Sequence, residues 1–215
     1  MTTSPDRSCR SSGRWDHTNH SILFLEIASL DGQGGTESDR QVARAPLHRV
    51  LRTAFAESDI SWESCRHTER REGVLVVVPP SVATSTIVDR LISHLEAGIR
   101  RYNREAAPLR IQLRASLHVG PVTVSAEGLS GRSIATASRL LNAPALMNHL
   151  ARTDADLAVM VSSQVYETVI RHASGFADPT RYEEVVVLTE ESEAPAWLCA
   201  AETRSSSTRP RYAPR

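Results

Sequence analysis

One acidic residue interrupts a run of apolar residues near the N-terminus. Residues 21–29 read SILFLEIAS, which has the length and composition of a central β-strand, and Glu26 is its only charged residue. An ionised carboxylate is costly to bury without a partner, so Glu26 needs a metal ion, an arginine, a raised pKa or an exposed strand end. The sequence leaves a metal ligand and a satisfied structural acid both open.

A second group of residues has the composition of an anion site. Gly131 opens a helix-like segment and is followed by Arg132 and Ser133. Free backbone N–H groups at a helix N-terminus, together with an arginine side chain, favour a bound phosphate. The segment GLSGRS at 128–133 is not a P-loop, because such a loop requires a lysine and all 25 basic residues of this chain are arginines.

Apolar periodicity predicts the elements that position these residues. Segments of strand period alternate with segments of helical period in the order β-α-β-β-α-β, and further elements follow. The expected strands are 21–29, 61–69, 74–78, 109–118, 122–125, 156–161, 184–188 and 196–200, and the expected helices lie around 47–55, 88–102, 131–141 and 165–170. We expect an α+β fold with a ferredoxin-like βαββαβ core, an antiparallel-rich sheet, helices packed on one side and extra C-terminal elements.

The two ends of the chain differ from this body in composition. Residues 1–19 and 203–215 are rich in polar and charged side chains and contain few apolar ones, so we expect disordered tails around a single domain at 20–202. The formal net charge is zero without a long basic run, which predicts no nucleic-acid partner. No segment approaches the roughly 20 apolar residues of a membrane helix, and no secretion signal is recognised. We expect a cytoplasmic protein without membrane contact.

Several segments together resemble the catalytic domain of the class III nucleotide cyclases, the adenylate and guanylate cyclases. The matching segments, in the order of the family, are LFLEI at 23–27, EGVL at 72–75, LHVGPV at 117–122, GRSIATASRL at 131–140 and VSSQVY at 161–166. They resemble the family's first strand, its β-hairpin, the segment before its flap, its Gly-Asp-x-Val-Asn-x-Ala-x-Arg-Leu helix start and a later strand and helix. The resemblance spans residues 22–200 and implies the cyclase fold.

The resemblance also implies a reaction. In that family the 3′-hydroxyl group of a nucleoside triphosphate attacks the α-phosphorus, and two divalent ions assist as a 3′,5′-cyclic monophosphate and pyrophosphate form. Glu26 and Glu72 fall on the metal positions, where the family has aspartate, so Mg²⁺ or Mn²⁺ is the implied cofactor. Arg139 falls on the arginine that stabilises charge developing on the phosphate, which makes it the candidate catalytic residue.

Other positions depart from the family pattern. Thr68 stands where the family has its base-selecting lysine, Gly128 brings no side chain to the second base-reading position, and Ala135 replaces the asparagine that orients the ribose. The glutamates are longer than aspartates, which would displace metal ions from in-line geometry. The remaining candidate nucleotide contacts are Gly131, Arg132, Ser133 and Thr68.

Each candidate also has a structural interpretation. Glu72 follows Arg70 and Arg71 in a predicted turn, where acids are commonly solvated. Arg139 has the alternative of a surface arginine on a helix, and His118 is expected to be a core or surface histidine.

These observations favour a degenerate cyclase homology domain. It would act as a dimerising nucleotide-binding or regulatory module with little or no turnover. The alternative is an active nucleotidyl cyclase with altered base selectivity, or one completed by a partner subunit. The family resemblance implies a homodimer, or a heterodimer with another cyclase-like chain, whose active site would lie between the subunits.

Overall fold

The computed structural model describes most of the chain between residues 18 and 200. The described residues are 18–30, 36–105, 109–125, 128–173, 177–188 and 193–200. The tails expected at 1–19 and 203–215 lie outside this part apart from residues 18 and 19, so their disorder and the domain bounds 20–202 stay predictions. No helix within the described part is long and apolar enough to cross a membrane.

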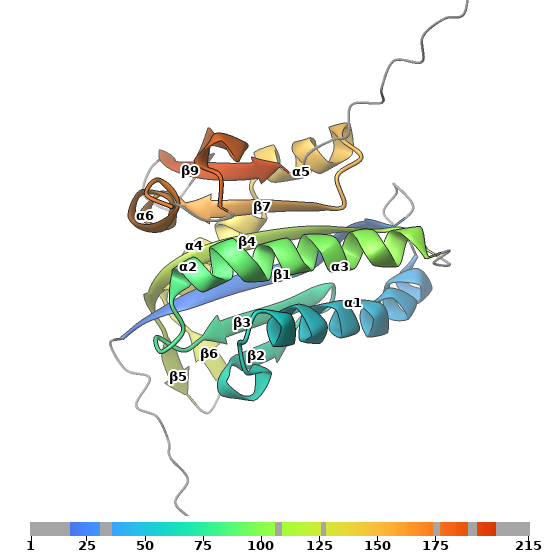
Figure 1. Ribbon diagram of the computed structural model, residues 1–215, viewed down its shortest axis with the longest axis horizontal. Coiled ribbons are helices and arrows are strands. Elements are labelled where there is room, and N and C mark those ends of the chain that lie inside the picture. Colours follow the sequence, from blue (N-terminus) through green and yellow to red (C-terminus); the bar gives the residue numbers. More distant parts are fainter. Residues whose placement is uncertain are drawn as a thin grey trace, which may run out of the picture.

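A seven-stranded mixed sheet forms the centre of the protein (Figure 1), with the strand order β2-β3-β1-β4-β7-β9-β8. Neighbouring strands run antiparallel except β4 and β7, which are parallel. The sheet strands are β1 (Asn19–Leu30), β2 (Arg66–Glu69), β3 (Gly73–Val78), β4 (Ile111–Pro121), β7 (Leu157–Ser162), β8 (Tyr182–Leu188) and β9 (Glu193–Ala200). A separate two-stranded sheet pairs β5 (Thr123–Ser125) with β6 (Gly128–Ser130).

Helices connect the strands in the predicted βαββαβ order, which confirms the α+β, ferredoxin-like expectation. The helical elements are α1 (Glu37–Glu57), η1 (Trp62–Ser64), α2 (Thr84–Thr86), η2 (Ile87–Leu91), α3 (Ile92–Arg104), α4 (Arg132–Leu141), α5 (Pro144–Arg152), α6 (Ser163–Val165), η3 (Tyr166–Ile170) and η4 (Pro179–Arg181). The strand expected at 61–69 begins only at Arg66, because Ser61 caps the turn η1 instead. Pro144 starts α5, a position that proline suits.

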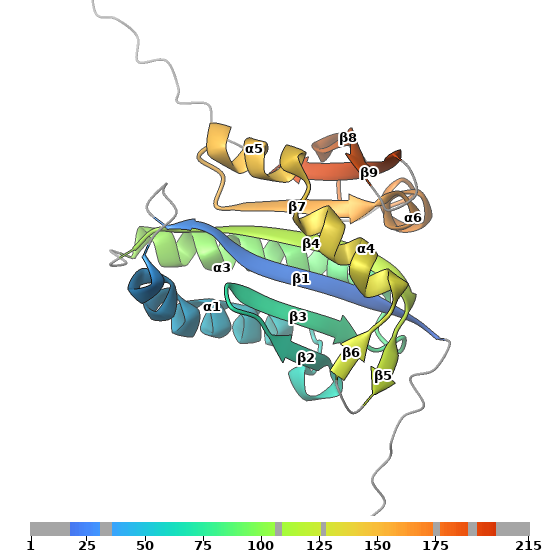
Figure 2. The same cartoon turned by 180° about the vertical axis from the view of Figure 1, so that it is seen from behind.

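The alternation of side chains along β1 gives each face of the sheet its own core. Leu23 and Leu25 are fully buried in the larger core beneath α1 and α3. Ile22 and Phe24 point to the other face, where they pack beneath α4. Figure 2 shows α4 and α5 on this second face, with α1 and α3 behind the sheet. The long helices α1 and α3 thus form the expected layer on one side, and two shorter helices add a partial layer on the other.

The β2–β3 hairpin approaches β1 too closely for any side chain at Gly73. A Cβ atom at this position would lie 1.8 Å from the carbonyl oxygen of Leu25. Gly73 pairs with Glu26 across the strands, and the N–H of Ile27 donates to the carbonyl oxygen of Glu72 at 2.8 Å. Glycine therefore sets the distance between hairpin and strand, and with it the placement of both predicted acids.

We expect Gly73→Ala to destabilise the fold by about 3 kcal/mol, because the added methyl group would overlap the backbone of the central strand. Urea denaturation followed by circular dichroism measures the free energy of unfolding. Gly98→Ala is the matched control: its Cβ would lie 3.0 Å from a movable methyl group of Val50. Alanine also favours the helix, so we expect the control to change the free energy by less than about 1 kcal/mol. Equal losses in the two variants would contradict this account.

Candidate functional site

Glu26 has an arginine partner within the sheet. It stands opposite Arg114 of β4 in the antiparallel register, and Nη2 of Arg114 donates to Oε2 of Glu26 at 2.7 Å. The two side chains are only 16% and 12% exposed. Of the partners that the sequence left open for Glu26, an arginine is present, so the charge of the carboxylate is balanced within the chain.

The pair lies on the face of the sheet that α4 and α5 cover. Residues two apart on a strand share a face, so Glu26 faces the same way as Phe24, which packs beneath α4. Nη1 of Arg114 donates to Sδ of Met147 on α5 at 3.0 Å. The guanidinium group is therefore held by the central strand on one side and by a helix on the other.

Glu72 points to the opposite face. It occupies the turn before β3, and its Oε1 lies 3.1 Å from Nη1 of Arg40 on α1. Across the strands it stands beside Ile27, whose side chain belongs to the core beneath α1. Glu72 and Glu26 are thus neighbours in the hairpin region, yet they face opposite sides of the sheet, because side-chain direction alternates along a strand.

Further arginine contacts tie the hairpin turn to α1. Nη2 of Arg44 donates to the carbonyl oxygens of Arg70 at 2.9 Å and Arg71 at 2.6 Å. Arg71 in turn pairs with Glu37 at the start of α1 at 2.8 Å, and its hydrogen bond lowers the pKa of the Glu37 carboxyl group. The sequence predicted a solvated turn. The turn is exposed as expected, but these contacts fix it to α1.

The ligands that the family resemblance implies for Mg²⁺ or Mn²⁺ do not fit this geometry. A pair of ions needs carboxylates that converge on shared positions, whereas Glu26 and Glu72 diverge and each is paired with an arginine. Among the described residues, no group of three or more His, Cys, Asp or Glu side chains is placed to hold a metal ion. The expected cofactor therefore lacks a matching ligand set in this part of the chain.

Arg139 lines a hollow of about 200 Å³ on the face that α4 covers. The polar lining of the hollow includes His118, Ser162 and Gln164. A hydrogen bond of 2.9 Å joins Nδ1 of His118 to the hydroxyl group of Ser162, and burial lowers the pKa of His118. The rest of the lining is mainly apolar and includes Leu140, Val187, Ala194 and Pro195. Arg139 is the charged residue of this lining, and a guanidinium group can pair with an anionic ligand.

Sequence reasoning missed this grouping. His118 was expected to serve only as a core or surface histidine, and neither Ser162 nor Gln164 was singled out. The parallel pairing of β4 with β7 brings His118 and Ser162 together. One local signal existed, because Ser162 ends a fully buried strand and caps the helical turn that follows, a place where functional side chains commonly gather.

The expected phosphate site at the start of α4 is only partly exposed. Gly131 precedes the helix with a φ of 131°, a conformation that favours glycine. Arg132 is exposed, but Ser133 is only 6% exposed. Ser133 packs against Gly120 so closely that a Cβ atom added to Gly120 would lie 2.3 Å from the hydroxyl oxygen of Ser133. Of these residues, Arg132 therefore offers the accessible side chain.

Thr68, the position that aligns with the base-selecting lysine, is exposed on the edge strand β2. It pairs with Leu75, which packs beneath α4, so Thr68 lies on the same face as Glu26. Arg139 of α4 borders this face as well. The structure thus gathers these predicted residues on one face of the sheet and separates Glu72 from them.

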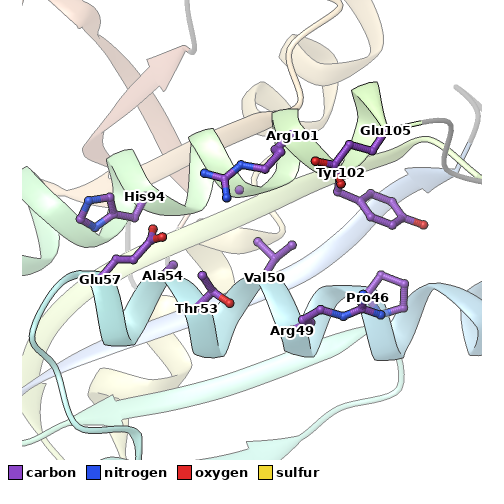
Figure 3. A pocket seen from close by; sticks show the side chains of 11 residues that line it. Pro46, Arg49, Val50, Thr53, Ala54, Glu57, His94, Arg101, Tyr102 and Glu105 are labelled. Carbon is purple, nitrogen blue, oxygen red and sulfur yellow. The ribbon is translucent and has the colours of Figure 1, made fainter.

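Another hollow, of about 300 Å³, lies between α1 and α3 on the opposite face (Figure 3). Side chains of both helices meet there, with Arg49 and Glu57 from α1 and His94 and Arg101 from α3. Basic and acidic groups are mixed in its lining, and none of the predicted site residues borders it. This hollow is therefore separate from the candidate site.

The arrangement of elements matches solved cyclase domains. An adenylate/guanylate cyclase/hydrolase from Silicibacter pomeroyi matches with a TM-score of 0.60 and 14% identity, over 87% of this chain and 99% of that one. The catalytic core of a rhodopsin-guanylyl cyclase with converted specificity, in complex with ATPαS, matches with a TM-score of 0.55 and 14% identity, over 86% and 96%. The guanylate cyclase domain of RhGC from Catenaria anguillulae, in complex with GTP, matches with a TM-score of 0.51 and 16% identity, over 86% and 98%.

The chain therefore has a class III cyclase-like fold. No protein-family model matches the sequence, and no curated protein matches it significantly. At this level of identity the likeness defines the fold and leaves the activity to the chemistry of the site.

We expect His118 to make stability depend on pH. Burial lowers its pKa in the folded state, so the unfolded chain takes up a proton first as the pH falls. Stability is therefore lost from the ordinary histidine pKa of 6.5 down to the lower folded value. His118→Gln should flatten the fall of the thermal midpoint over this range, and His172→Gln, at an exposed position, should leave the slope unchanged. Thermal denaturation over a pH series tests both, and an unaltered slope in His118→Gln would exclude the effect.

Proposed function

We propose that this chain is a degenerate cyclase homology domain that dimerises and binds a nucleoside triphosphate, and that it serves as a regulatory module with little or no turnover. The observation that carries the proposal is the pairing of both predicted metal acids with arginines on opposite faces of the sheet. Without converging carboxylates, the described part of the chain lacks its own means to activate a ribose hydroxyl group through metal ions. The cytoplasm is its expected location.

Nucleotide binding is the part of cyclase function that the pocket supports. Arg139, the arginine that matches the family pattern, borders the hollow together with His118 and Gln164. A guanidinium group pairs well with phosphate oxygens, and the solved relatives include complexes with GTP and with ATPαS. Thr68 carries no charge, so we expect weak selection between bases.

The second candidate function is an active nucleotidyl cyclase with altered base selectivity, completed by a partner subunit. The position of Arg139 at the hollow favours it, because a second chain could then supply the metal carboxylates and the ribose-binding amide. A homodimer would repeat the same arginine-paired acids, Glu26 and Glu72. A heterodimer with another cyclase-like chain is therefore the form that would complete the site.

Turnover is tested directly. Purified protein incubated with Mn²⁺ and ATP, GTP, CTP or UTP should yield no cyclic monophosphate detectable by mass spectrometry, because Glu26 and Glu72 do not converge. Glu26→Ala serves as the control for contaminating activity. A cyclic product that the wild-type chain forms and Glu26→Ala does not would establish the active cyclase in place of the binding module.

Binding is tested separately from turnover, by fluorescence titration with a fluorescent nucleoside triphosphate. We expect Arg139→Ala to weaken binding about 10-fold, which corresponds to the loss of roughly one charge-assisted hydrogen bond. Arg152→Ala, which removes an exposed arginine at the end of α5, is the matched control and should leave the affinity unchanged. Equal affinities of all three proteins would rule out Arg139 as a phosphate contact.

A further inference from the structure

We propose that the guanidinium group of Arg114 is a built-in cation that takes the place of a divalent metal ion at Glu26. The family resemblance gives this position to a metal ion, and the structure gives it to a side chain of the same chain. The inference deepens the part of the proposed function that concerns turnover, because both rest on the pairing of Glu26 with Arg114, and it holds whether or not the chain binds a nucleotide.

Strand pairing places Arg114 beside Glu26. The two residues are opposite each other in the β1–β4 register, and directly opposite side chains of antiparallel strands lie about 5 Å apart at Cβ, where opposite charges attract. The carboxylate is only 16% exposed, so a rotamer that moved the guanidinium group away would leave a largely buried charge without a partner. The sheet register therefore brings the two residues together, and the burial of the carboxylate favours the paired rotamer of Arg114.

The guanidinium group uses the space that a metal ion would need. Nη2 of Arg114 lies 2.7 Å from Oε2 of Glu26, and carboxylate oxygens hold Mg²⁺ at about 2.0–2.1 Å, so the two cations compete for the same side of the carboxylate. On its far side the group donates to the Met147 thioether at 3.0 Å. A hard divalent cation prefers oxygen ligands to a thioether, and so these surroundings suit the arginine better than the metal.

The cross-strand neighbours of the pair bring no further carboxylate. Gly73 stands beside Glu26 on β3, and Ala158 stands beside Arg114 on β7. Next to Glu26 along its own strand, Phe24 occupies the same face. A metal ion at this place would therefore depend on Glu26 alone among these sheet positions, whereas ions in proteins usually gather several oxygen ligands.

A second guanidinium group adds positive charge to the same face. Arg70 lies over the Phe24 ring, with its guanidinium carbon 5.1 Å from the ring centre. Phe24 is two residues before Glu26 and shares its face. Together with Arg114, this arginine makes the surroundings of the carboxylate positive, and like charges repel an approaching divalent cation.

The proposal is tested with the full chain and Mn²⁺ alone. For the wild-type chain we expect neither the EPR signal of free Mn²⁺ nor the urea midpoint of unfolding to change when the two are mixed. Arg114→Met removes the charge and keeps an apolar stem, so the urea midpoint should fall, because Glu26 is left largely buried without a cation. The double variant Glu26→Gln/Arg114→Met should regain most of the midpoint and ignore Mn²⁺, because neither charge remains unpaired.

Arg40→Met is the matched control, since it removes the partner of Glu72 from a pair whose side chains are 30% exposed. We expect it to lower the midpoint less than Arg114→Met does. Binding of Mn²⁺ by the wild-type chain that disappears in Glu26→Gln would overturn the proposal, as would a folded Arg114→Met with an unchanged midpoint. If Arg114→Met fails to fold, the comparison of wild type with Glu26→Gln still decides the matter. A failure of nucleotide binding would leave all of these results unaffected.

Discussion

The pairing of β1 with both of its neighbours constrains the rest of the structure. β1 lies between β3 and β4 in the sheet, and its apolar side chains alternate between a core beneath α1 and α3 and a second core beneath α4. Gly73 lets β3 approach the carbonyl group of Leu25. A strand that is buried on both faces resists any slip in register, because a shift by one residue would exchange the side chains of its two faces. The register therefore decides where each acid points.

This register explains why acids that are close in space do not form one site. Glu26 faces the side of α5 and Glu72 faces the side of α1, and each meets an arginine on its own side, Arg114 and Arg40 respectively. The chain has 25 arginines and no lysine. The planar guanidinium group of arginine pairs well with a carboxylate. The result is a domain of cyclase-like architecture in which Glu26 and Glu72 are each paired with an arginine of the same chain.

The features that favour binding and those that oppose turnover belong to different parts of this architecture. Arg139 lines the hollow beside α4 and brings a charged group to it. Glu26 and Glu72, the acids that the sequence resemblance assigned to metal ions, are instead paired with arginines. Binding requires complementarity to the ligand as it is, whereas catalysis requires groups placed for the transition state. A guanidinium group beside a hollow, without converging acids among the described residues, suits the first task better than the second.

The sequence by itself determined the βαββαβ order of the first strands and helices, the strand position of Glu26 and its need for a partner, because apolar periodicity and the cost of burying a charge are read from local residues. It did not predict the short strand β6 or the helix α5. Only the tertiary structure decided which partner Glu26 takes, since Arg114 is 88 residues away and reaches it through strand pairing. It likewise joined His118 to Ser162 across 44 residues, and it turned Glu72 toward α1. Pairing between distant segments leaves no local pattern, and side-chain direction reverses with every residue of a strand, so these contacts depend on the register of the folded sheet.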